Sequence, residues 1–262
     1  METKKVIGKR RFSLTITTLA FVFLYLPIIA LVLLSFNGSR QGVSWTGFTL
    51  KWYSELFRQA DVWRAFLNTV IIAVSSSLVA TAIGTFAAVA LYWYKSRMKG
   101  YLGVLVYTPL IIPDILMGVS MLIFFVAIGI PLGLITIFIA HVTFCVSYVT
   151  VTVMTRLEDF DYSIVEAARD LGAKSSQVFR RVIVPMIMPG IMAGFLLSLT
   201  LSIDDFVITF FVAGPGSTTL PLKIYSMIKF GVSPVINALS TLLLVGTLFI
   251  SFFGSRFRKL IF

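Results

Sequence analysis

Three carboxylates lie inside long apolar stretches of this sequence, where charged side chains are rare. Asp114 follows Pro113 in one stretch, and Asp204 and Asp205 are neighbours in another. A charged side chain at the centre of a membrane-spanning helix costs about 2.5–3.5 kcal/mol, so such groups usually face a cavity or a partner and mark a functional site. No Lys or Arg lies in the same stretch as any of the three. These residues therefore indicate cation binding, with the counter-charge supplied by a second subunit or by a cationic cargo.

Structural roles for the same carboxylates are the alternatives. Pro109 and Pro113 interrupt the backbone hydrogen bonds of a helix, so Asp114 could instead cap a helix that restarts after them. Asp204 or Asp205 could be protonated and hydrogen-bonded to another helix. The sequence leaves these alternatives open.

No other group of residues indicates catalysis or metal binding. His141 and Cys145 lie one helical turn apart, but two such groups do not make a metal site, so we predict that His141 forms an interhelical hydrogen bond. Cys145 is the one cysteine, which excludes disulfides and Cys-based metal sites. The sequence lacks the P-loop, serine-hydrolase and zinc-protease motifs. We therefore expect no catalytic residue, no metal site and no cofactor in this chain.

The composition predicts that these residues are held by membrane-spanning helices. Of the 262 residues, 58% are hydrophobic and 13% are charged, and the mean hydropathy is +0.97. The apolar stretches reach the length of about 20 residues that a bilayer requires. We predict an all-α polytopic membrane protein, a single transmembrane domain over residues 1–262. Its six spans are expected at residues 12–36, 68–94, 102–128, 132–154, 185–212 and 235–254, with a loop at 155–184 between spans four and five.

The basic residues predict the orientation of these spans. Sixteen Lys and Arg fall in the N-terminus, the turn after the second span, the 155–184 loop and the C-terminus, and six fall on the opposite side. By the positive-inside rule, both termini and the 155–184 loop are cytoplasmic. The net charge of +11 then reflects topology and does not indicate nucleic-acid binding.

The loop between spans four and five contains a predicted short helix. Ser163 and Glu166 have the spacing of a capping box, and Gly172 stands where a helix end favours positive φ. A set of apolar residues falls on one helical face: Ile164, Ala167, Ala168 and Leu171. A helix of about two turns is too short to be stable alone. It must dock on a partner, on the membrane surface or on the chain's own bundle.

The same loop resembles the EAA loop of binding-protein-dependent (MetI-like) ABC importer permeases. The resemblance rests on the spacing of Glu166-Ala167-Ala168, Gly172, Val182 and Val184-Pro185. The family pattern has Ile and Leu where this chain has Val182 and Val184, and both changes keep an aliphatic residue. The resemblance implies that the loop is a coupling helix seated in a cleft of the ATP-hydrolysing subunit. Its expected contact residues are Glu166, Ala167, Ala168, Leu171 and Gly172.

The wider sequence resembles one branch of that family, the permeases of spermidine/putrescine importers. The likeness includes Lys51-Trp52-Tyr53, Pro113-Asp114, Asp204-Asp205-Phe206-Val207 and the run from Leu220 to Tyr225. It implies a bacterial inner-membrane subunit that works with ABC ATPase subunits, a second homologous permease and a periplasmic solute-binding protein. ATP and Mg would bind the ATPase. The cargo would be a polyamine, and its path would include Asp114, Asp204, Asp205, Phe206 and Tyr225.

Other functions remain open at this stage. The chain could be an ABC importer permease for another solute, an ion-coupled secondary transporter with the carboxylates as ion sites, or a structural membrane subunit. The outer segment 37–67 contains Trp45, Trp52 and Trp63, which favour the membrane boundary or a docking surface. The outer segment 213–234 is expected to form a short amphipathic helix at the interface or to re-enter the bundle.

Overall fold

The computed structural model describes residues 2–40, 44–93, 98–229 and 233–261, and their regular elements are helices. The chain forms two compact units, Met1–Val62 with Ile224–Phe262, and Trp63–Lys223. Lys95 and Arg97, which contribute to the predicted charge asymmetry, lie outside the described residues.

In the first unit, the segment that follows the N-terminal helix is hydrogen-bonded to the next helix along the chain. The unit contains α1 (Glu2–Leu34), α2 (Lys51–Arg58) and α12 (Pro234–Ile261), and α12 contacts both other helices. The Trp52 indole Nε1–H donates to the Asn37 carbonyl at 2.6 Å, and the Trp52 side chain is buried. Trp52 is therefore part of the packed interior of this unit and not an exposed boundary residue, whereas Trp45 is exposed.

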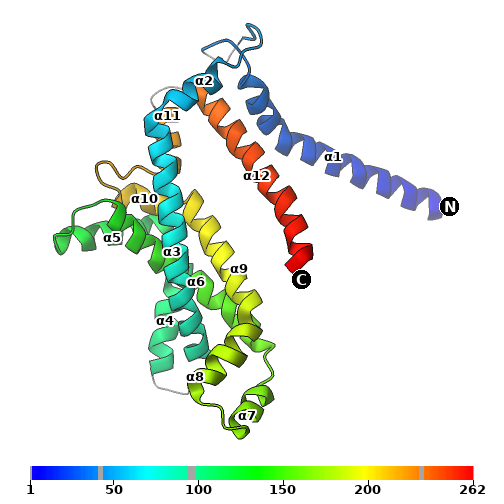
Figure 1. Ribbon diagram of the computed structural model, residues 1–262. Helices are drawn as coiled ribbons and strands as arrows, with labels where there is room; N and C mark the ends of the chain where they lie inside the picture. Colours follow the sequence, from blue (N-terminus) through cyan, green and yellow to red (C-terminus); the bar gives the residue numbers. More distant parts are fainter. Residues whose placement is uncertain (1, 41–43, 94–97, 230–232, 262) are drawn as a thin grey trace. The chain divides into compact units, whose positions relative to one another are not determined.

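The second unit is built around the antiparallel pair α6 (Leu134–Glu158) and α9 (Val184–Asp204), which lie against each other (Figure 1). The long α3 (Ala60–Trp93) packs on α6 at Gly84, where an added Cβ would lie 2.8 Å from the Val149 Cβ. At Gly190 an added Cβ would lie 2.8 Å from the Arg156 Cβ. Small residues at these crossings let the helix backbones approach closely, as is common in membrane bundles.

Two of the predicted spans are broken helices. Residues 102–128 form α4 (Met98–Ile111) and α5 (Asp114–Ala127), which are bent by 115° where Pro113 is extended and lacks a backbone donor. Residues 185–212 form α9 and the short α10 (Val207–Val212), with Asp205 extended between them. The interruption at Pro113 agrees with the restarted helix that the prolines suggested, whereas the break at Asp205 was not anticipated. Both breaks place carboxylates at helix ends.

Four described helical segments are long and apolar enough to cross a membrane: Phe12–Leu34, Ala60–Trp93, Leu134–Glu158 and Ser175–Asp204. The bent pair α4–α5 would be a fifth, and the apolar part of α12, Pro234–Phe249, is shorter. The last of the four long segments combines α8 (Ser175–Val178), the π-helix η1 (Phe179–Ile183) and α9. The count of six spans stays a prediction.

The segment after α10, predicted to lie on the outer side, forms a short helix, α11 (Leu220–Lys229). The chain leading to it is fixed to the start of α3. The Asn68 amide donates to the Thr218 carbonyl at 3.0 Å, and the Leu220 N–H donates to the Thr69 hydroxyl at 2.7 Å. These two bonds satisfy backbone groups of the loop where it packs against α3.

The tight crossing at Gly84 gives a stability prediction. Replacing Gly84 with Leu should lower the melting temperature of the purified protein in detergent, because the larger side chain forces α3 away from Val149 and costs about 1–3 kcal/mol. The matched control is Gly103→Ala in α4, where an added Cβ meets no atom within 4 Å. Equal melting temperatures for the two variants would contradict the close α3–α6 packing.

Candidate translocation site

A cavity of about 310 Å³ lies where the two broken helices meet α6 in the second unit. It brings together the three carboxylates that the sequence singled out. Its lining residues are Pro109, Asp114, Phe144, Tyr148, Leu201, Asp204, Asp205, Phe206, Val207 and Ile208. Phe206 of the predicted path is thus at the cavity. Tyr225 lies in the first unit and does not line this cavity, so its role stays a prediction.

The Asp205 carboxylate is engaged by donors of its own chain. Its Oδ1 accepts from the Ile208 N–H at 3.3 Å, and its Oδ2 accepts from the N–H and the hydroxyl of Thr209 at 2.8 and 2.7 Å. The His141 Nε2 lies 3.3 Å from the same Oδ2. Backbone N–H groups can only donate, so this arrangement matches an ionised carboxylate that holds the first turn of α10.

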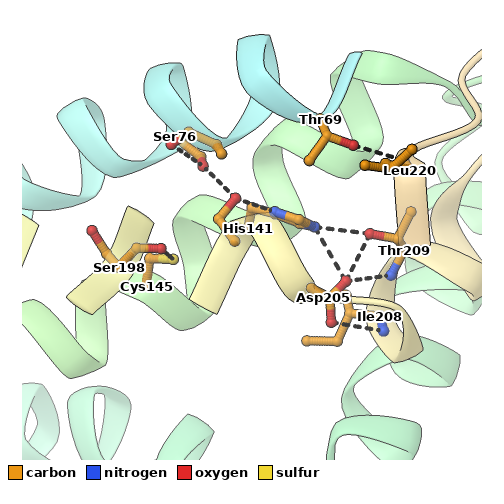
Figure 2. Close-up of polar contacts among 11 residues, drawn as sticks. Thr69, Ser76, His141, Cys145, Ser198, Asp205, Ile208, Thr209 and Leu220 are labelled. Carbon is orange, nitrogen blue, oxygen red and sulfur yellow. Dashed lines mark hydrogen bonds and ion pairs between the residues drawn. The ribbon is translucent and has the colours of Figure 1, made fainter. Parts of the chain in front are cut away.

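His141 is the centre of this buried group of polar side chains, as Figure 2 shows. Its Nδ1 lies 2.6 Å from the Ser202 hydroxyl of α9, and its Nε2 lies 3.0 Å from the Thr209 hydroxyl of α10. The predicted interhelical hydrogen bond from His141 is confirmed. The sequence did not reveal Asp205 as a partner of His141, because the two residues lie in different apolar stretches. The sequence contains one histidine, and its position in an apolar stretch was the feature that could have indicated a partner for a buried carboxylate.

Asp204 and Asp114 differ from Asp205. Both side chains are exposed and line the cavity. Asp204 is the last residue of α9, and Asp114 is the first residue of α5. The helix does restart at Asp114, but within the described chain no side chain caps its first turn, so the capping alternative is wrong. In the described residues, neither carboxylate forms an ion pair.

The predicted short helix of the 155–184 loop is α7 (Ser163–Asp170). Gly172 has φ +82°, as predicted. The Gly172 N–H donates to the Arg169 carbonyl at 2.8 Å, and the Ala173 N–H donates to the Ala168 carbonyl at 3.1 Å. This pair of bonds is a Schellman motif, which ends the helix and needs a residue with positive φ.

The start of α7 differs from the prediction. Ser163 is not the N-cap of a capping box with Glu166, since α7 has no such side-chain cap. The Ser163 N–H instead donates to the Asp161 carboxylate at 2.9 Å. Hydrogen bonds from the side chain and then the backbone of Ser163 hold the pKa of Asp161 below its ordinary value.

The buried face of α7 also differs from the prediction. Val165 is buried in the core of the second unit, to which α7 belongs, and Ala168 packs against that core. The Leu171 side chain is instead 89% exposed. Glu166 and Ala167 are exposed as well. The predicted apolar face is therefore only partly correct, because Val165, which lay outside it, is the residue that the bundle buries. The described chain leaves the Leu171 side chain largely uncovered.

The matches to known proteins agree with this arrangement. Residues 80–261 match the family described as binding-protein-dependent transport system inner membrane component. This chain belongs to that family. The permease is 47% identical over 228 residues to the spermidine/putrescine transport system permease protein PotC of Escherichia coli K12, covering 87% of this chain and 86% of that protein. It is 44% identical over 239 residues to the putrescine transport system permease protein PotI of the same organism, covering 88% and 85%.

The fold of the permease is also found in a solved structure. A bacterial ABC transporter involved in the import of the acidic polysaccharide alginate has a chain that superposes with a TM-score of 0.72 at 16% identity. The superposition covers 95% of this chain and 97% of that one. The solved structure supports the helical fold, and the family match and the curated relatives identify the chain as a transport permease subunit and not an enzyme.

The different surroundings of the two adjacent carboxylates predict different stability effects. Asp205→Asn should lower the melting temperature of the purified permease complex in detergent, because a buried acceptor for His141 and Thr209 is weakened at a cost of about 1–3 kcal/mol. Asp204→Asn is the matched control and should leave the melting temperature nearly unchanged, since its side chain is exposed. A larger loss for Asp204→Asn would contradict this assignment.

Proposed function

We propose that the permease forms half of the translocation path of an ATP-driven importer for polyamines such as spermidine and putrescine. The observation that carries the proposal is the cavity in which Asp114 and Asp204 have no ion-pair partner among the described residues. Polyamines carry several ammonium groups, and two free carboxylates beside a low-dielectric bundle suit such a cargo. The names of the curated relatives, one for spermidine/putrescine and one for putrescine, support the same cargo class.

The aromatic lining of the cavity supports a cationic cargo independently of the carboxylates. Phe144 and Tyr148 come from α6, and Phe206 lies at the break between α9 and α10. A cation held over an aromatic ring gains about 0.5–2 kcal/mol, with the larger value where water is excluded. The methylene carbons of a polyamine are apolar and would contact the Leu201 and Ile208 walls.

The proposed assembly has four kinds of component. This permease and a second homologous permease would span the bacterial inner membrane within the lipid bilayer. This chain would have both termini in the cytoplasm and six spans in one domain over residues 1–262. ABC ATPase subunits would bind ATP and Mg, and a periplasmic solute-binding protein would deliver the cargo. The basic residues then face the cytoplasm and need no nucleic acid.

The exposed part of α7 is proposed to contact the ATPase. Glu166, Ala167 and Leu171 are exposed next to Gly172, while Val165 attaches the helix to the permease. Because α7 is fixed on one side and open on the other, a push from the ATPase would be passed to the bundle. This arrangement supports a coupling role for the loop at residues 155–184.

The first experiment is uptake of labelled spermidine and putrescine in cells that lack their own system. The permease is expressed with its neighbouring genes, and one component is omitted at a time. Saturable uptake that disappears without the ATPase is expected. Uptake by the permease alone, driven by an ion gradient, would favour a secondary transporter. An assembled complex that hydrolyses ATP but moves no polyamine would indicate another solute.

The cavity carboxylates give a prediction for cargo affinity. Asp204→Asn should raise the apparent KM for spermidine about tenfold, which is the loss expected for one charge-assisted hydrogen bond, and Asp114→Asn in addition should raise it further. Assembly with the ATPase should be kept because both side chains are exposed. Glu55→Gln in α2 of the first unit, outside the cavity, is the control. Normal uptake by the double variant would exclude these residues from the path.

The exposed side chain of α7 gives a prediction for coupling. Leu171→Glu should reduce ATPase co-purification and uptake by about tenfold or more, because a buried Leu contributes about 1.5–3 kcal/mol to an interface. The melting temperature of the permease should not change, since Leu171 is 89% exposed in this chain. Leu171→Met keeps the apolar contact and is the control. Full uptake by Leu171→Glu would remove this residue from the ATPase contact.

A further inference from the structure

A line of buried polar side chains joins four helices of the second unit. It runs from Ser76 of α3 to Ser202 of α9, 3.2 Å between hydroxyl oxygens, then to His141 of α6, and ends at Thr209 of α10 and the Asp205 carboxylate. We call Ser76, Ser202, His141, Thr209 and Asp205 the hydrogen-bond relay (Figure 2). Polar groups away from water must be paired by the chain itself, and each hydroxyl and ring nitrogen of the relay has a partner.

The relay has one consistent direction of donation when His141 is neutral. A carboxylate only accepts, so the His141 Nε2 is the protonated nitrogen and donates toward Thr209 and Asp205. The Nδ1 then accepts from the Ser202 hydroxyl, which accepts in turn from the Ser76 hydroxyl. The Thr209 hydroxyl donates its own proton to Asp205 at 2.7 Å. Each member fixes the orientation of the next.

The relay ends beside the cavity. Asp205 has φ −61° and ψ 122°, an extended conformation that directly follows Asp204, the last residue of α9. Asp205 is held at this break by its bonds to His141, Ile208 and Thr209, and Asp204 precedes it directly and lines the cavity. The bonds of Asp205 therefore fix the end of α9 from which the Asp204 side chain reaches the cavity.

We propose that His141 is a positioning residue for cargo recognition. It acts through Asp205 to set the direction of the Asp204 carboxylate, and it does not itself contact the cargo. This inference rests on the proposed function, because it assigns to Asp204 the contact with an ammonium group. It also separates two neighbouring carboxylates, one that binds and one that orients.

The test compares two amide replacements of His141 in the full complex. The side-chain amide of His141→Gln reaches the place of Nε2 and can donate to Asp205. That of His141→Asn reaches only the place of Nδ1, near Ser202, and leaves Asp205 without this donor. We expect the apparent KM for spermidine to stay within about twofold for His141→Gln and to rise about tenfold for His141→Asn, at equal ATPase co-purification.

A double-mutant cycle decides whether His141 acts through Asp204. In the Asp204→Asn background, His141→Asn should cause no further rise in KM, since the carboxylate that it positions is already gone. Additive effects on KM, or equal effects of the Gln and Asn replacements, would overturn the proposal. Thr143→Val is the matched control on α6, because Thr143 is exposed and its hydroxyl, among the described residues, bonds the Ile139 carbonyl of its own helix and no member of the relay.

Two further measurements keep the outcome clear. If His141→Asn fails to assemble, Ser202→Ala removes the hydroxyl shared by the His141 Nδ1 and Ser76 and leaves the imidazole in place, and an unchanged KM for that variant would overturn the proposal. If the unmodified complex takes up no spermidine, the proposed function fails by itself. The relay is then judged by the melting temperatures of His141→Asn, Asp205→Asn and the double variant, where additive shifts would overturn it.

Discussion

A carboxylate that is largely buried in an apolar helix bundle needs hydrogen-bond donors from the chain, because an unpaired buried charge is costly. Asp205 meets this requirement with two backbone N–H groups, the Thr209 hydroxyl and the His141 ring. These donors come from α6 and α10, and His141 in turn bonds α9 through Ser202. The position of one acidic side chain thus requires three helices to be placed correctly. A fourth, α3, is added through Ser76.

The cavity exists because two helices are interrupted at the same level of the bundle. Pro113 interrupts one by removing a backbone donor, and Asp205 interrupts the other by accepting N–H groups that would otherwise continue the ladder. Each break leaves a free carboxylate at a helix end, Asp114 on one side and Asp204 on the other. Non-helical backbone at membrane depth is tolerated only where it is buried in protein or lines a cavity, and residues at both breaks line this cavity.

The features that the sequence predicted correctly depend on neighbouring residues. Gly172 was predicted to have positive φ from its place after a two-turn helix, and the structure gives φ +82°. The helix restart after Pro113 likewise followed from the missing donor of proline. The features that were missed depend on residues distant in the chain. The hydrogen-bond partner of Asp205 is His141 of another helix. Val165 is the buried residue of α7 because side chains of α3 and η1 lie beside it. Spacing along one helix cannot reveal which face a distant helix covers.

The π-helix η1 connects the loop that contains α7 with the helix that carries Asp204. A π-helical turn contains one residue more than the α-helical pattern, and each residue of an α-helix turns the chain by about 100°. The rotational phase between α8 and the end of α9, which form one continuous helical segment with η1, is therefore set by this extra residue. A relative of the same length with a regular α-helix at residues 179–183 would present a different side of α9 to the cavity. The side of α9 that faces the cavity is thus determined by five residues, Phe179–Ile183, that do not line it.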